Sequence, residues 1–389
     1  MNKAGRHMGQ QMVLHGDLVL PEGIIPEGEL IIEGSRIQEV NLRATRSDPT
    51  HAWHSGWIFP GLIDLHIHGA AGYDFMDASV EAFEAIDGTL ARLGCTGYLA
   101  TTLSASSDAL QRVLQAARQY GDHAVNSGML GVHLEGPFIH PQRIGAQRAD
   151  CVRPPSLSEL ESYRRILGPL LKRITLAPEI PKAQDLINFC RRSGIGVSAG
   201  HSNATFDQAR TAFGAGVHQV THLFNGMTGL HHRDPGLAGA ALTHPEVWVE
   251  LIADGVHVHR EMIRLVGQLK GPNHTILVTD AMRAAELGDG MFDLGGQSVQ
   301  VKDGQARLGD GSLAGSTLSL MRAVFNYQTF AMVDLCEAVR AASLIPARVL
   351  GLADRGALEP GFWADVLFVD TAGRNRMTWR NGQIIFDGR

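Results

Sequence analysis

The middle of the chain alternates short apolar runs with longer amphipathic segments, whereas both ends consist of short apolar runs separated by turn residues. Residues 1–57 show no helical period, and Pro and Gly divide their apolar runs. Residues 355–389 follow the same pattern. Such runs are typical of strands joined by turns. We therefore expect both termini to form one small β-sandwich domain, residues 1–57 and 355–389, beside a central domain of residues 58–354.

The central domain contains eight apolar runs, with helix-length amphipathic segments in the gaps between them. This alternation predicts parallel strands with helical crossovers, and eight such units predict a (β/α)8 barrel of the α/β class. The expected strands are residues 62–68, 97–103, 129–135, 174–179, 196–201, 219–224, 247–253 and 275–280. The expected helices include residues 80–93, 109–120, 181–192, 206–213, 260–269 and 317–330. A Gly- and Asp-rich stretch, residues 283–312, interrupts the alternation and is expected to be an excursion after the eighth strand.

Composition adds the limits of an ordinary globular enzyme. Of the 389 residues, 44% are hydrophobic and 19% are charged, which argues against disorder. The 34 Lys and Arg and 40 Asp and Glu give a net charge of −6, so we expect no nucleic-acid partner. No run approaches the ~18 apolar residues of a membrane span, and residues 1–11 lack the apolar stretch of a signal peptide. We expect a cytoplasmic protein with no membrane partner, in which the four widely spaced cysteines are reduced.

Six residues of metal-ligand type occur near the ends of predicted strands. His66 and His68 are two positions apart, so the strand period places both imidazoles on one face. Such a pair alone is weak, because isolated His-x-His sequences are common. Later strands end near four further residues, Glu135, His201, His222 and Asp280. Any one of these could be a helix cap or a core residue, but the strand ends of a barrel converge, so the six together predict a metal site.

The donor types also restrict the metal and its chemistry. Imidazole and carboxylate ligands without thiolates favour Zn²⁺ or Fe²⁺, and their number is sufficient for two ions if one carboxylate bridges them. A site of this kind offers a hydroxide near neutral pH, a polarised carbonyl and a carboxylate that moves a proton.

Six motifs follow one another along nearly the whole chain. They are PGLIDLHIHG from residue 60, HLEGPF from 133, AGHSNAT from 199, THLFNGM from 221, DPGLAG from 234 and LAGS from 313. In order and spacing they resemble the N-acetylglucosamine-6-phosphate deacetylase family of the amidohydrolase superfamily. The resemblance implies the barrel, the small domain built from both termini, and hydrolysis of N-acetyl-D-glucosamine 6-phosphate to D-glucosamine 6-phosphate and acetate.

The resemblance also implies roles for the candidate ligands. Glu135, His201 and His222 would bind the main metal ion, while His66, His68 and Asp280 would add a second site. Some family members replace the His-x-His histidines and use one ion, so their presence here favours two. Asp280 would be the catalytic residue, acting as general base and then as general acid.

Substrate contacts carry over from the same motifs. The implied set is Ala146, Gln147, Asn225, Gly226, Arg233, His257, Leu313, Ala314 and Gly315. Arg233 is the expected phosphate partner because a guanidinium suits phosphate oxygens, although a solvated surface arginine is the alternative. Part of the phosphate site of the family crosses a dimer interface, so a homodimer is implied. Gln147 stands where some members carry a histidine, and it can donate a hydrogen bond but carries no charge.

Three alternatives stay open. A deacetylase of the galactosamine epimer would differ in loop contacts that the sequence does not expose. Another amidohydrolase, such as a cyclic-amide hydrolase or an N-acyl-amino-acid deacylase, should carry a metal-bridging lysine on the fourth strand, and residues 174–179 offer none. A non-catalytic scaffold should have lost ligands, yet all six candidates are present.

Overall fold

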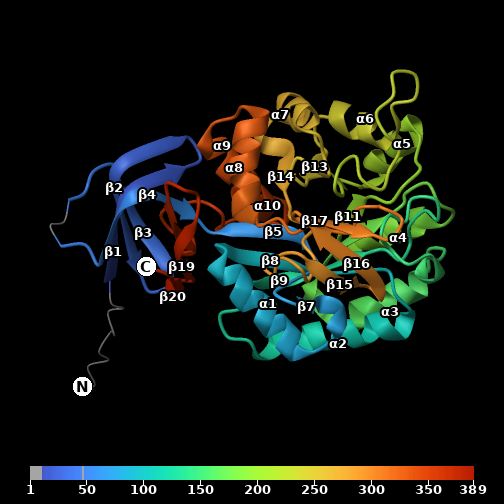
Figure 1. Cartoon of the computed structure of the whole chain (residues 1–389), viewed down its shortest axis with the longest axis horizontal. Coiled ribbons are helices and arrows are strands. Elements are labelled where there is room, and N and C mark those ends of the chain that lie inside the picture. Colours follow the sequence, from blue (N-terminus) through green and yellow to red (C-terminus); the bar gives the residue numbers. More distant parts are fainter. Residues whose placement is uncertain (1–10, 46–47) are drawn as a thin grey trace.

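The computed structural model describes residues 11–45 and 48–389, and Figure 1 shows a barrel domain beside a smaller sheet built from both chain ends. Most of residues 1–11, on which the expectation of no signal peptide rests, lie outside the described residues. Within the described part, no helix has both the length and the apolar character needed to cross a membrane.

Eight parallel strands form the barrel, in the order β14-β13-β12-β11-β10-β9-β8-β5. They are β5 (Leu62–Ile67), β8 (Cys95–Thr102), β9 (Met129–Glu135), β10 (Leu171–Leu176), β11 (Gly196–Ala199), β12 (Gln219–Val220), β13 (Trp248–Leu251) and β14 (Thr275–Leu277). A backbone hydrogen bond of 2.9 Å from the Asp280 amide to the His66 carbonyl brings the two edges together. The predicted (β/α)8 fold with a terminal β-domain is confirmed.

Helices surround the barrel, and most of them present an apolar stripe to it, while α6 is buried on nearly all sides. They are α1 (Val80–Arg92), α2 (Ser107–His123), α3 (Leu157–Leu167), α4 (Ala183–Ser193), α5 (Phe206–Ala215), α6 (Gly236–Thr243), α7 (Arg260–His274), α8 (Leu320–Ala331), α9 (Leu335–Ala341) and α10 (Leu344–Val349). In α1, for example, Phe83, Ile86 and Leu90 are buried, and the Ser79 hydroxyl accepts a hydrogen bond from the Ala82 amide at the N-terminus.

Seven of the eight barrel strands end before the predicted residue, by one to four positions, and β9 ends where predicted. Strands β11, β12 and β14 stop at Ala199, Val220 and Leu277, and the chain then turns out of the sheet. His201, His222 and Asp280 have φ angles of 47°, 27° and 50°, in the left-handed region that ends a strand. The pattern missed this because the residues after each strand remain buried. These three candidate ligands therefore lie in turns just beyond the strands.

Both chain ends contribute to a seven-stranded sheet in the order β20-β19-β18-β4-β1-β2-β3. Its strands are β1 (Gln11–Leu20), β2 (Gly23–Glu33), β3 (Arg36–Asn41), β4 (His51–Pro60), β18 (Val366–Asp370), β19 (Asn375–Arg380) and β20 (Gln383–Asp387). Leu14, Ile58, Phe368 and Trp379 belong to its core. Gly61 alone separates β4 from the first barrel strand, and a Cβ there would lie 2.0 Å from the Thr96 hydroxyl. The domain limits of 57 and 355 stay a prediction.

The expected excursion after the eighth strand contains a three-stranded antiparallel sheet. The sheet consists of β15 (Gly290–Leu294), β16 (Gln297–Lys302) and β17 (Gln305–Leu308), which are labelled near the middle of the barrel domain in Figure 1. Its apolar side chains pack on Leu103, Met282 and Ala314. The remaining short elements are β6 (Gly69–Ala70), β7 (Tyr73–Asp74) and the 3-10 turns η1 (Phe75–Asp77), η2 (Ala149–Cys151) and η3 (Gly168–Leu170).

Candidate active site

Glu135, His201 and His222 form a compact buried group at the C-terminal ends of the barrel strands. Glu135 is the last residue of β9, and the histidines follow β11 and β12 by two residues. The Glu135 Oε1 atom lies 3.0 Å from the Nε2 atom of each histidine. The two Nε2 atoms are 3.1 Å apart. One oxygen and two ring nitrogens thus face one point.

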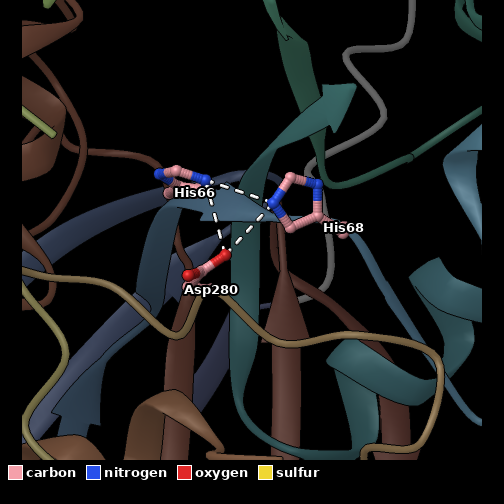
Figure 2. Close-up of side chains that lie close together, drawn as sticks. All are labelled: His66, His68 and Asp280. Carbon is pink, nitrogen blue, oxygen red and sulfur yellow. Dashed lines mark hydrogen bonds and ion pairs between the residues drawn. The ribbon is translucent and has the colours of Figure 1, made fainter. Parts of the chain in front are cut away.

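His66, His68 and Asp280 form a second group, shown in Figure 2. The two Nε2 atoms lie 3.3 Å apart, and the Asp280 Oδ1 atom is 3.1 Å from that of His68 and 3.6 Å from that of His66. Glu135 joins the two groups, since its Oε1 atom is 3.4 Å from His66 Nε2 and its Oε2 atom 3.5 Å from His68 Nε2. All six predicted ligand residues therefore meet at one place.

The orientation of three rings fits a metal site. The Nδ1 atom of His68 lies 3.2 Å from the Thr101 carbonyl oxygen, and that of His201 lies 2.7 Å from the Arg143 carbonyl oxygen. The Nδ1 atom of His66 lies 3.0 Å from a Glu250 oxygen. In the neutral ring, which is the form that binds a metal, an Nδ1 that donates its proton to such an acceptor leaves Nε2 with a lone pair. These lone pairs point toward one another and toward carboxylates, an arrangement that a shared cation stabilises.

A third group of possible ligands, His66, His133 and Glu250, lies below the site. Both ring nitrogens of His133 are already engaged, since Nδ1 lies 3.1 Å from the Leu65 carbonyl oxygen and Nε2 lies 2.7 Å from the Thr175 hydroxyl. We therefore regard His133 as part of the barrel interior and not as a metal ligand.

The site requires positive charge. Burial opposes ionisation of Glu135, but His66 and His201 outweigh it and hold the pKa of Glu135 well below its usual range. Burial likewise opposes ionisation of Asp280, whose pKa is nevertheless lowered to about 2 by His66 and His68. The same carboxylates overcome the effect of burial on His68 and raise its pKa to about 9. Both carboxylates are therefore anionic, as metal binding requires.

A cavity of about 560 Å³ opens above the two groups. Its walls include five predicted ligands, all except His66, which is fully buried below. Seven of the predicted substrate residues also line it: Ala146, Gln147, Asn225, Gly226, His257, Leu313 and Gly315. The excursion contributes Leu294, Arg307 and residues 311–313 to the wall, so this sheet encloses part of the cavity.

Two predicted substrate residues lie elsewhere. Ala314 is fully buried among the apolar residues beneath the excursion and does not line the cavity. Arg233 is exposed on the loop before α6, where its Nη1 atom lies 2.8 Å from His232 Nε2, and it is also absent from the cavity wall. Contact of Arg233 with phosphate stays a prediction.

Two arginines that the sequence analysis did not select line the cavity. Arg143 lies on the loop after β9 and donates to the Asn203 side chain over 2.7 Å. Arg307 lies on β17 and donates to the Gly311 carbonyl over 2.7 Å. Among the described residues, no carboxylate forms an ion pair with either of them, because the salt bridges involve other arginines. Their charges are thus available to an anion.

Two further contacts hold predicted residues in place. Gln147 is buried and donates from Nε2 to Glu135 Oε2 over 2.5 Å, while its oxygen accepts from the Ser104 amide over 2.6 Å. The amide that stands in place of histidine therefore contacts a candidate ligand directly. The His257 Nδ1 atom lies 2.6 Å from an Asp254 oxygen, which fixes the ring at the cavity wall.

The predicted range of the fourth strand, residues 174–179, was wrong. Strand β10 begins at Leu171, so it includes Lys172, which the expected range missed. Lys172 is the second residue of the strand, about 13 Å before the C-terminal end at a rise of about 3.3 Å per residue. It is therefore too far along the strand to bridge ions at that end, and the argument against a bridging lysine still holds.

Histidines and carboxylates grouped at the C-terminal strand ends of a parallel (β/α)8 barrel are typical of metal-dependent hydrolases. The model of the amidohydrolase family matches residues 57–387, so this chain belongs to the amidohydrolase family and is a hydrolase.

Several relatives within this family are deacetylases of amino-sugar phosphates. N-acetylglucosamine-6-phosphate deacetylase of Lysinibacillus sphaericus is 39% identical over 84% of this chain and 85% of the relative. N-acetylgalactosamine-6-phosphate deacetylase of Escherichia coli O157:H7 is also 39% identical, over 84% and 87%. The structure of a variant N-acetyl-D-glucosamine-6-phosphate deacetylase from Mycobacterium smegmatis, in complex with N-acetyl-D-glucosamine-6-phosphate, superimposes with a TM-score of 0.93 at 30% identity, over 97% of this chain and 100% of that chain. The resemblance to the N-acetylglucosamine-6-phosphate deacetylases is confirmed.

Proposed function

We propose that this chain hydrolyses the acetamide of N-acetyl-D-glucosamine 6-phosphate, releasing acetate and D-glucosamine 6-phosphate. The observation that carries the proposal is the convergence of six candidate ligands, five of them lining a cavity and His66 just below it. The cavity wall also holds two arginines that form no ion pair with a carboxylate among the described residues. Candidate metal ligands at the bottom of the cavity suit an amide, and the cationic side chains on its wall suit a phosphate. A substrate that carries both groups would match the cavity. The names of the similar deacetylases support the same substrate class.

The donor set suits one or two divalent ions, and we propose Zn²⁺ or Fe²⁺. Glu135, His201 and His222 would hold the main ion, and His66, His68 and Asp280 would hold a second. A metal in these positions supplies a water of lowered pKa and polarises the amide carbonyl.

Asp280 is the proposed proton carrier. Its side chain is 13% exposed, lines the cavity and carries an ionised carboxylate. In the reaction, the carboxylate would accept a proton from the attacking water and then deliver it to the amide nitrogen as the carbon–nitrogen bond breaks. Water and amide thereby become acetic acid and an amine, which after exchange of one proton are acetate and the ammonium form of the sugar, and Asp280 returns to its starting state.

Arg143, Arg307 and His257 are the proposed partners of the phosphate. A guanidinium presents paired N–H donors that suit phosphate oxygens. His257 is positioned by Asp254, so its Nε2 atom is the ring nitrogen left for a ligand. Arg233 would add a contact across a homodimer, in keeping with its place on an exposed loop outside the cavity of its own chain.

The deciding experiment measures acetate release from N-acetyl-D-glucosamine 6-phosphate and from the unphosphorylated sugar, with metal content determined on the same sample. We expect turnover of the phosphorylated sugar and a far lower kcat/KM without phosphate. A metal-loaded sample that releases no acetate from the phosphorylated sugar would exclude the proposed substrate.

The galactosamine epimer is the second candidate, because the Escherichia coli O157:H7 relative with 39% identity is an N-acetylgalactosamine-6-phosphate deacetylase. The two sugars differ in the orientation of one hydroxyl group. A side-by-side comparison of kcat/KM on both phosphorylated sugars decides between them.

A further inference from the structure

Glu250 is a charged residue inside the barrel that none of the proposed roles includes. It lies on β13, is 0% exposed, and lies on the opposite side of His66 from the cavity. Figure 2 shows that one ring nitrogen of His66 faces His68 and Asp280 while the other points away from them. That second nitrogen, Nδ1, lies 3.0 Å from the Glu250 Oε2 atom.

The same carboxylate also contacts the group of candidate ligands formed by Glu135, His201 and His222. The backbone amide of His222 donates to Glu250 Oε2 over 3.2 Å. The next amide, that of Leu223, donates to the Glu250 carbonyl oxygen over 2.8 Å. His222 has a φ of 27°, a left-handed conformation that is unfavourable for a residue with a side chain and must be held by its surroundings. Glu250 therefore supports the turn that directs His222 toward Glu135.

The Glu250 side chain is held by hydrogen bonds inside the barrel. Gln219 donates a side-chain hydrogen bond to Glu250 Oε1, which gives the two oxygens three donors in total. Arg173, which is 2% exposed, lies close enough to be affected by its charge: burial lowers the pKa of Arg173 to about 10, and Glu250 acts in the opposite direction. A carboxylate that accepts a hydrogen bond from an imidazole N–H fixes the tautomer and the orientation of the ring.

We propose that Glu250 is a positioning residue for both groups of candidate metal ligands. It holds the ring of His66 in one group and the backbone of His222 in the other. The inference rests on the proposed metal-dependent function, but it concerns the affinity for metal and not the identity of the sugar. The competing explanation is that Glu250 only neutralises Arg173 inside the barrel. The two explanations predict different results for a variant that keeps the negative charge at residue 250 but has a shorter side chain.

Glu250→Asp makes that distinction. Aspartate keeps a negative charge near Arg173 but is one methylene shorter, so it no longer reaches His66 Nδ1 and the His222 amide together. Glu250→Gln keeps the length and removes the charge. The matched control is Glu29→Gln in the terminal sheet, because Glu29 is also 0% exposed and its Oε2 atom lies 3.0 Å from His15 Nε2.

The test is a zinc titration of metal-free protein in competition with a chromophoric chelator, without sugar, together with the melting temperature of each metal-free variant. We expect zinc affinity to fall about 10- to 100-fold in Glu250→Asp and Glu250→Gln, the usual effect of losing a group that orients a ligand. Glu29→Gln should bind zinc within twofold of the parent chain. Because no sugar is present, this result is independent of the deacetylase assay.

Unchanged zinc affinity in Glu250→Asp would overturn the proposal, whatever its melting temperature. If Glu250→Gln does not fold, Glu250→Asp still decides, since it retains the charge beside Arg173. A fall in zinc affinity that Glu29→Gln shows equally would also overturn the proposal, because the effect would then follow from any lost buried charge.

Discussion

Replacing Asp280 with Asn separates proton transfer from metal binding. The substitution keeps the size of the side chain and removes its charge, and Asn tolerates the left-handed backbone of this position, where φ is 50°. Asp280 lies within 3.6 Å of His66 and His68 but is not one of the group formed by Glu135, His201 and His222. The main ion should therefore stay bound.

General acid–base catalysis contributes about 10²- to 10⁴-fold, which corresponds to about 3 to 5 kcal/mol of activation free energy. We expect kcat for acetate release to fall by this factor in Asp280→Asn, with at least one ion retained per subunit. Asp74→Asn is the control. Like Asp280, Asp74 is buried, at 0% exposed, and its charge acts on His68. It differs in that it caps η1 and does not line the cavity, so it has no access to the substrate. A kcat for Asp280→Asn within tenfold of the parent chain, at known metal content, would refute Asp280 as the proton carrier.

Three further predictions concern phosphate, metal and pH. Arg143→Met and Arg307→Met should each raise KM for the phosphorylated sugar about tenfold or more, since charge-assisted hydrogen bonds contribute about 1.5–3 kcal/mol, and leave KM for the unphosphorylated sugar unchanged; equal effects on both sugars would contradict the phosphate role. Removal of metal by a chelator should abolish acetate release and lower the melting temperature, and Zn²⁺ or Fe²⁺ should restore both; full activity of metal-free protein would contradict metal dependence. Burial lowers the pKa of Lys270 from 10.5 to about 8, so between pH 8 and 10.5 the unfolded chain binds a proton that the folded chain has released, and stability from this group rises with pH. The melting temperature of the parent chain relative to Lys270→Met should accordingly increase across this window, and a constant difference would contradict it.

The sequence predicted the ligand positions because they follow strongly apolar strands. Glu135 ends β9 in full agreement with the expected range of residues 129–135. His201, His222 and Asp280 were placed at the correct end of the barrel although they lie in left-handed turns past the strands. The order of strands fixes which end of the barrel these residues share, so errors of two to four residues in the strand ends did not change the site.

Several contacts made by loop residues and by interior polar residues could not be predicted from the sequence. Arg143 and Arg307 come from a loop and from the excursion sheet, and nothing in their local pattern distinguishes them from solvated arginines. Glu250 and Arg173 occupy buried strand positions where an apolar side chain is the usual occupant. Ala314 belongs to a motif whose neighbours line the cavity, but its side chain points into apolar packing. Such distinctions depend on the folded neighbourhood of each residue.

Gly61 has a consequence for how this molecule can be divided. It is the single residue between β4 of the terminal sheet and β5, the strand that leads to His66 and His68. Its amide donates to the Asp365 carbonyl oxygen over 2.9 Å, and Thr96 leaves no room for a side chain at this position. The terminal sheet thus acts as a clamp on the register of the first barrel strand. A barrel excised from residue 62 onward would lose the contact that holds the start of the strand carrying its His-x-His pair, so we expect the barrel to depend on the terminal sheet for its folding.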